Sequence, residues 1–130
     1  MPQFSALLVG NSRFLRGAAS SMLANHGLRV FSAKDGEHAL QLAALNRPDI
    51  VLLDSMQAEA HWAEILQQFR QNAETSGIPI IILGGLTHEK QNYSGSGPVD
   101  YGPVDFVNKD SAVLDQLSLR IRNYLRQKPS

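Results

Sequence analysis

The sequence predicts a doubly wound α/β domain, in which helices cover both faces of a parallel sheet of about five strands. Short aliphatic runs alternate along the chain with segments that have helical spacing. The runs are apolar at consecutive positions, which is typical of parallel strands buried on both faces. A length of 130 residues suits one domain with a single core, so we expect residues 1–130 to form it. In such folds, ligands and chemistry collect at the carboxyl ends of the strands.

The first half of the chain contains two strands and two helices. A strand over 6–9 precedes a helix that Ser12 can cap and that stops near Gly27. A second strand over 28–33 precedes a helix that Asp35 can cap and that Pro48 ends. Spacings of three and four predict the inward stripes, which are Leu15, Ala18, Ala19, Met22 and Leu23 in the first helix and Leu40, Ala43 and Ala44 in the second.

The second half continues the alternation. The third strand, over 50–53, runs directly into Asp54, so a carboxylate stands at the end of a strand that looks fully buried. Further strands are predicted over 78–83 and 104–108, and Gly77 is expected to close the helix before the first of them. The apolar stripes of the last two helices are Trp62, Ile65, Leu66 and Phe69, and Leu114, Leu117, Ile121 and Leu125.

Composition excludes several classes of function. The 12 basic residues balance the 12 acidic ones, and the absence of cysteine removes disulfides and thiolate chemistry. No signal segment or membrane-spanning run is present, so we expect a cytoplasmic protein that binds neither nucleic acid nor membrane. The histidines have no metal-ligand spacing, and the basic residues near the end are typical of a helix C-terminus: Arg120, Arg122, Arg126 and Lys128.

The stretch AKDGEHALQLAALNRPDIVLLD, residues 33–54, resembles the receiver (CheY-like) domain of two-component response regulators. PIIIL and VDFVNKD resemble the fourth and fifth strands of that family, so the resemblance covers nearly the whole chain. It implies a flavodoxin-like fold with strand order 2-1-3-4-5. It also implies that Asp54 is the phosphoacceptor position, Lys109 the phosphoryl-neutralising position and Phe106 the aromatic switch position, while Arg16 matches an arginine common in the first helix.

The sequence departs from the family pattern where the family binds Mg²⁺ and the phosphoryl group. Gly10 and Asn11 replace an acidic pair, and Mg²⁺ prefers anionic oxygens. Gly84 replaces the Ser or Thr whose hydroxyl grips the phosphoryl oxygen, so of the two switch positions, Gly84 and Phe106, the first is altered. Gly10, Asn11 and Met56, which lies in the loop after Asp54, form a degenerate metal site. We therefore expect no cofactor, with weak Mg²⁺ binding left open.

Three hypotheses for function follow. The leading one is a phosphorylation-impaired pseudo-receiver that is not an enzyme and that works by protein contact in a phosphorelay, with Lys109 paired to Asp54. The second is a conventional receiver that is switched by phosphorylation of Asp54. The third is a small flavodoxin-like enzyme or cofactor-binding domain with Asp54 as nucleophile, although Met56 stands where a phosphatase of that kind would carry a second carboxylate.

The resemblance also indicates where partners bind. The 84–126 face corresponds to the usual output face, so we expect a sensor kinase, a phosphotransfer protein or an attached output domain to contact it, and a homodimer is left open. Glycines and a proline within residues 92–102 predict an irregular connection that displays Tyr93 and Tyr101.

Overall fold

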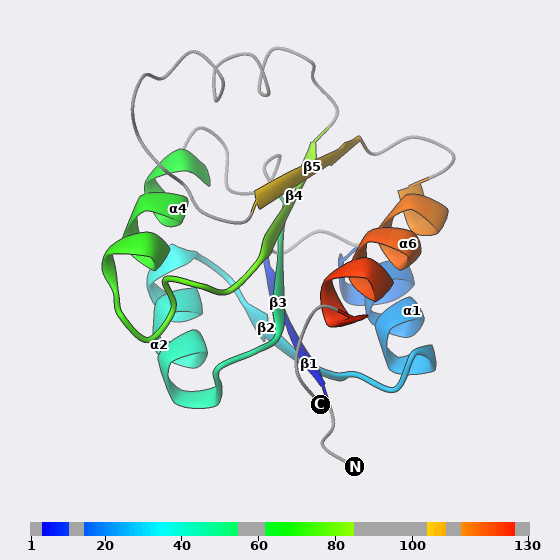
Figure 1. Cartoon of the computed structure of the whole chain (residues 1–130), viewed down its shortest axis with the longest axis horizontal. Helices are drawn as coiled ribbons and strands as arrows, with labels where there is room; N and C mark the ends of the chain where they lie inside the picture. The colour runs from blue at the N-terminus through cyan, green and yellow to red at the C-terminus, as the bar shows by residue number, and fades with distance from the viewer. Residues whose placement is uncertain (1–3, 11–14, 55–61, 85–103, 109–112, 127–130) are drawn as a thin grey trace.

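The computed structural model describes residues 4–10, 15–54, 62–84, 104–108 and 113–126. In this part of the chain, five parallel strands form one sheet in the order β2-β1-β3-β4-β5 (Figure 1). This result confirms both the predicted fold class and the predicted strand order. The strands are β1 (Ser5–Val9), β2 (Arg29–Ala33), β3 (Ile50–Asp54), β4 (Ile80–Gly84) and β5 (Val104–Asn108).

Helices cover both faces of the sheet. One face carries α2 (Gly36–Asn46) and α4 (Trp62–Gln71), and the other carries α1 (Ser20–Asn25) and α6 (Val113–Arg126), as Figure 1 shows. A π-helical turn, η1 (Leu15–Ala19), leads into α1. Among the described residues, no helix combines the length and the apolar character that crossing a membrane requires.

The strands bury alternate side chains in two cores, one on each face of the sheet. Leu7, Val51 and Ile80 belong to the core under α2 and α4, whereas their neighbours Leu8, Leu52 and Ile81 belong to the core under α1 and α6. Because successive side chains of a strand point to opposite faces, a strand between two helical layers must be apolar at every position. This requirement explains the uninterrupted aliphatic runs in the sequence.

The predicted helix ends are confirmed at three places. The Asp35 carboxylate accepts a hydrogen bond from the backbone N–H of His38 at 2.9 Å, so Asp35 caps α2. Helix α2 ends at Asn46, before Pro48, and Arg47 follows in the left-handed conformation. Gly27 follows α1 with a φ of 84°, which a glycine adopts without strain.

The end of α4 was predicted wrongly. The helix stops at Gln71, well before Gly77, because side chains of the next residues compete for the backbone. The Thr75 hydroxyl donates to the carbonyl oxygen of Phe69 at 2.6 Å, and the Asn72 side chain accepts from the N–H of Glu74 at 3.0 Å. Such local bonds offer the backbone an alternative to another helical turn.

The buried residues of the first two helices differ from the predicted inward stripes at two positions, Ala18 and Ala44. Ala18 is exposed, while Ala19 and Leu23 are fully buried. The π-helical turn has hydrogen bonds that span five residues, so it changes the angular spacing that the prediction assumed. In α2, Ala39 and Ala43 are the fully buried pair, and Ala44 is only half-buried. The predicted cap Ser12 and the side chains of Trp62 and Leu114 lie outside the described residues.

Candidate functional site

Asp54 is the last residue of β3, and its side chain is fully buried. The strand lies in the middle of the sheet, between β1 and β4. Asp54 therefore ends the central strand at the carboxyl edge of the sheet, which is the edge where doubly wound folds place their functional sites. Asp54, the position expected for the phosphoacceptor, thus lies at this edge, and its role stays a prediction.

The strand registers bring the other predicted positions to the same edge. Val9 pairs with Leu53, so the next residue, Gly10, emerges beside Asp54. On the other side, Asp54 pairs with Leu83, so Gly84 extends one residue beyond it. Both strand ends that flank the buried carboxylate therefore carry glycine, which contributes no side-chain oxygen.

Gly10 has a backbone conformation that the sequence analysis did not predict. Its φ is 128°, in a region that residues with a side chain rarely adopt. Its N–H donates to the carbonyl oxygen of Ala33 at 2.9 Å, which joins the end of β1 to the end of β2. The sequence did carry one signal for this conformation, which is a glycine directly after a predicted strand. The backbone at this position is suited to glycine and would strain an acidic residue.

Burying a carboxylate is costly unless it is paired or hydrogen-bonded. In the described part of the chain, no buried side-chain nitrogen or oxygen lacks a hydrogen-bond partner. Hydrogen bonding therefore offsets the cost of burying the Asp54 carboxylate, as is expected of buried polar groups.

Several predicted site residues lie outside the described residues: Asn11, Met56, Lys109, Tyr93 and Tyr101. The predicted contact between Asp54 and Lys109, and the predicted irregular segment 92–102, stay predictions. Phe106 lies within β5, and its strand neighbour is Ile82 of β4. Arg16 lies in η1 and is exposed.

The donor atoms of the described residues do not fit a strong site for a hard dication. Among these residues, no group of three or more His, Cys, Asp or Glu side chains is arranged to hold a metal ion. On either side of Asp54, Gly10 follows β1 and Gly84 ends β4. Mg²⁺ prefers near-octahedral coordination by oxygens, with carboxylates among them, and among the described residues Gly10 and Gly84 add no side-chain oxygen to that of Asp54.

A parallel sheet in the order 2-1-3-4-5, with a buried aspartate ending its central strand, defines the class of receiver-type α/β domains. Residues 6–122 match the family of response regulator receiver domains, and the chain belongs to that family. It is a receiver domain of a two-component response regulator, as the resemblance implied, and receiver domains are signalling modules.

Curated relatives include the response regulator MprA of Mycobacterium sp. strain KMS, which is 33% identical over 121 residues, covering 93% of this chain and 50% of the relative. MprA of Mycobacterium leprae strain TN is 31% identical over the same length. The chain thus spans about half the length of the curated relatives it matches.

Solved structures of low sequence identity share the fold. The chemotaxis response regulator CheY4 of Vibrio cholerae is 22% identical with a TM-score of 0.78, and the match covers 95% of this chain and 99% of that one. The receiver domain of the sensor histidine kinase PA1611 from Pseudomonas aeruginosa PAO1, which has a magnesium ion in its active site cleft, is 21% identical with a TM-score of 0.79, covering 97% and 100%.

Proposed function

We propose that this receiver domain transmits information by protein contact and that Asp54 is an inefficient phosphoryl acceptor. The observation that supports the proposal is the pair of glycine strand ends, Gly10 and Gly84, on either side of the buried Asp54. Efficient phosphorylation of a carboxylate needs anionic side chains that hold Mg²⁺ and hydrogen-bond donors for the phosphoryl oxygens, and these two positions supply no side chain for either purpose.

The electrostatics of the reaction explain why this loss matters. Phosphoryl transfer to a carboxylate brings additional negative charge next to an anion, so catalysis consists mostly of positioning and charge neutralisation. Asn11 would offer a neutral amide where the family has a carboxylate. Of the phosphorylation residues expected from the family, Asp54 and Lys109 remain, and we assign Lys109 to pairing with Asp54.

The switch that follows phosphorylation is also incomplete. A hydroxyl at position 84 would bond to the phosphoryl group and draw the end of β4 inward, but this residue is glycine. Phe106, at the switch position in β5, would then be uncoupled from the state of Asp54. We therefore place the regulation of this domain in its contacts with other proteins.

The partners follow from the family and from the length of its relatives. We assign the 84–126 face to contact with a sensor kinase, a phosphotransfer protein or an attached output domain. The curated relatives are about twice as long as this chain, which supports an attached domain as one of these candidates. We also propose that the protein acts in the cytoplasm.

The proposal is tested by incubating the protein with acetyl phosphate and Mg²⁺ and measuring intact mass over time. We expect little or no added phosphoryl mass. Asp54→Ala is the control for the site, and Asp49→Asn controls for labelling at another strand-flanking aspartate. Rapid, Mg²⁺-dependent labelling that is absent only from Asp54→Ala would overturn the proposal.

The burial of Asp54 at the carboxyl edge also favours a second candidate, the conventional receiver switched by phosphorylation. The two candidates differ in their response to a restored ligand. If Asp54 is impaired because acidic ligands are missing, Asn11→Asp should increase the labelling rate by about tenfold or more, which corresponds to at least ~1.4 kcal/mol. In a conventional receiver the wild-type chain would already label rapidly, and the substitution would add little.

A further inference from the structure

A concave surface lies at the opposite edge of the sheet from Asp54. Six residues from three segments line a groove of about 260 Å³: Phe4, His26, Ile121, Arg122, Leu125 and Arg126. Phe4 precedes β1, His26 follows α1, and the other four belong to the C-terminal half of α6. Because the helices run antiparallel to the strands they connect, their C-terminal ends lie at the amino edge of the sheet, and the groove lies there with them.

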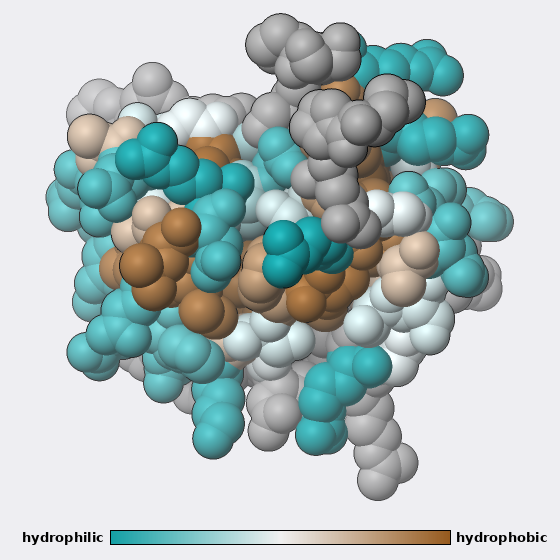
Figure 2. Space-filling view, turned by 90° about the horizontal axis from the view of Figure 1, so that it is seen from below, coloured by the Kyte–Doolittle hydropathy of each residue, from teal (hydrophilic) through white to brown (hydrophobic). Residues whose placement is uncertain are grey.

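The apolar part of the groove continues the core between α1 and α6. Ile121 is fully buried, and Phe4 and Leu125 are partly buried and pack against the same core. Figure 2, which views the molecule from below, shows apolar surface across the middle of this face with hydrophilic side chains around it. An apolar side chain bound in this groove would therefore contact the edge of the existing core.

The rim of the groove is cationic. Arg122 and Arg126 lie one helical turn apart on α6, and both are exposed. Within the described part of the chain, neither guanidinium forms an ion pair, and no acidic residue lines the groove. Two arginines on neighbouring turns, beside apolar surface and with no carboxylate among the described lining residues, could bind carboxylates from another molecule.

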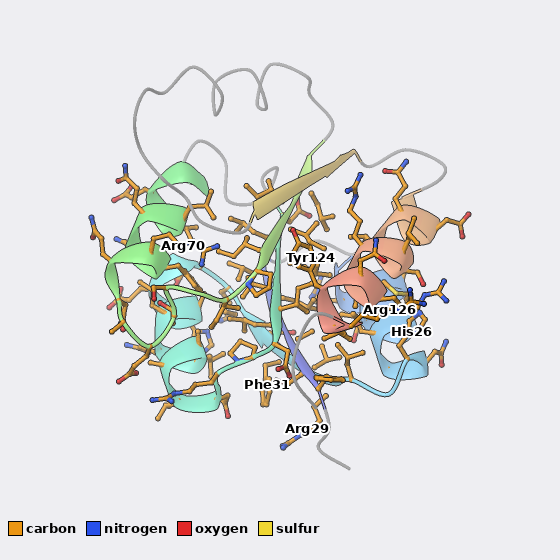
Figure 3. The ribbon with its side chains drawn as sticks, in the orientation of Figure 1. His26, Arg29, Phe31, Arg70, Tyr124 and Arg126 are labelled. Atoms are coloured by element: carbon orange, nitrogen blue, oxygen red, sulfur yellow. The ribbon has the colours of Figure 1, made fainter. Side chains whose placement is uncertain are left out.

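The walls of the groove are held together by a contact between distant parts of the chain. His26 Nε2 and Ser118 Oγ form a hydrogen bond of 2.9 Å between the end of α1 and the middle of α6. Figure 3 shows His26 and Arg126 on the same side of the molecule. Because this bond joins the two elements that supply the walls, the groove is formed before any partner binds, which lowers the entropic cost of binding.

We propose that this groove binds a peptide segment of a protein partner that carries a large apolar side chain next to carboxylates. The volume is smaller than the roughly 300–1,000 Å³ of small-molecule pockets, so it suits one or two anchoring side chains. Arginine and aromatic residues are also enriched in protein interfaces, and arginine is among the residues that carry most of the binding energy. The inference rests on the contact-based function proposed above, since α6 belongs to the 84–126 face.

The test uses three labelled synthetic peptides and fluorescence anisotropy with the whole chain. The first peptide has two glutamates, leucine, phenylalanine and two further glutamates. In the second peptide the four glutamates are glutamines, and in the third the leucine and phenylalanine are serines. We expect the first peptide to bind at least roughly tenfold more tightly than either of the others, because both features of the groove are needed.

Variants of the groove provide the second arm. Arg126→Glu and Arg122→Glu should each weaken binding of the acidic peptide about tenfold or more, whereas Arg47→Glu makes the same charge change at an exposed position following α2 and should have little effect. The double variant, with both Arg122→Glu and Arg126→Glu, should instead bind a peptide in which lysine replaces each glutamate. That exchange of specificity is not expected if the arginines only stabilise the helix. Circular dichroism and urea midpoints check that each variant is folded.

The possible outcomes separate this proposal from the one on Asp54. Equal affinity for all three peptides, or an Arg126→Glu variant that binds like Arg47→Glu, would overturn the groove proposal and leave the labelling result unaffected. One-to-one binding of hexanoate as tight as that of the acidic peptide would also overturn it, in favour of a small carboxylate ligand. Rapid labelling of Asp54 would refute phosphorylation-independent signalling but would not remove binding at the groove.

Discussion

Asp49 and Ser5 are joined by two hydrogen bonds that run in opposite directions. The Ser5 N–H donates to Asp49 Oδ2 at 2.8 Å, and the Asp49 N–H donates to the Ser5 carbonyl oxygen at 2.9 Å. The pair joins the beginning of β1 to the residue before β3. In the register that follows, Ala6 pairs with Ile50 and Val9 with Leu53, which is the alignment that brings Gly10 beside Asp54.

Replacing the Asp49 carboxylate should therefore destabilise the domain. Asp49→Ala leaves the partly buried Ser5 N–H without its side-chain acceptor, so we expect a loss of about 1–3 kcal/mol in the free energy of unfolding. Asp49→Asn keeps an acceptor oxygen and should lose less. Urea denaturation measures both, with Glu74→Ala as an exposed control that should change stability by less than ~0.5 kcal/mol. An Asp49→Ala protein as stable as the control would contradict this role.

Gly36 is required for the close approach of α2 and α4. A Cβ atom at this position would lie 2.7 Å from Ile65 Cγ1 and 3.1 Å from Ile65 Cδ1. Because Ile65 is itself buried, Gly36→Ala should destabilise the domain by about 1–3 kcal/mol through overpacking. Thermal or urea unfolding measures the loss, and Gly17→Ala, where a Cβ meets nothing within 4 Å, is the matched control.

A double-mutant cycle identifies the cause of that loss. In an Ile65→Ala background the atoms that meet the new Cβ are absent, so Gly36→Ala should cost less than it does in the wild type. The coupling energy should be about 0.5–3 kcal/mol, the range found for residues in contact. Strict additivity of the two substitutions would show that Ile65 is not the obstacle.

Arg70 holds the connection between α4 and β4. Its Nη1 donates to the carbonyl oxygens of Thr75, Ser76 and Ile78 at 3.3, 3.0 and 2.8 Å. Arg70→Met keeps much of the apolar stem and removes these bonds, so we expect a loss of about 1–3 kcal/mol. Hydrogen exchange should show lower protection of the N–H groups of Thr75 and Ile78, which bond within this connection.

The matched variant for Arg70 is lysine. Arg70→Lys keeps the charge but lacks the planar guanidinium, so it should restore only part of the stability. Full recovery with lysine would mean that charge, rather than the set of bonds to three carbonyls, is what the position requires.

The backbone at Gly10 should resist an added side chain. Because its φ is 128°, Gly10→Ala and Gly10→Asp should both destabilise the domain by about 1–3 kcal/mol. Gly77→Ala is the control, since a Cβ there meets nothing within 4 Å and its φ lies outside the region that favours glycine. Urea midpoints measure these changes. If Gly10→Asp were as stable as the wild type, the backbone conformation at position 10 would not disfavour an acidic residue there.

Most of the fold could be predicted from local patterns. The aliphatic run before Asp54 is buried on both faces, and the cap at Asp35 and the left-handed Gly27 are where the sequence placed them. The end of α4 could not be predicted from a local pattern, because Gly77 is a typical residue after a helix and yet the helix ends at Gln71. The bonds made by Thr75 and Asn72 end the helix earlier, and side chains of this kind also occur within helices.

The sequence by itself determined where the strands lie to within about two residues, since the fourth was predicted over 78–83 and spans Ile80–Gly84. It also determined that Asp54 ends the third strand and that Gly10 and Gly84 supply no ligand side chains. These properties depend on residue type and on spacing within one element. Only the tertiary structure decided the register that puts Gly10 beside Asp54 and Gly84 one residue beyond it, and that His26 meets Ser118 beside the groove at the end of α6. The physical reason is that strand register and helix packing are set by contacts between residues far apart in the chain, and a local pattern carries no information about those distances.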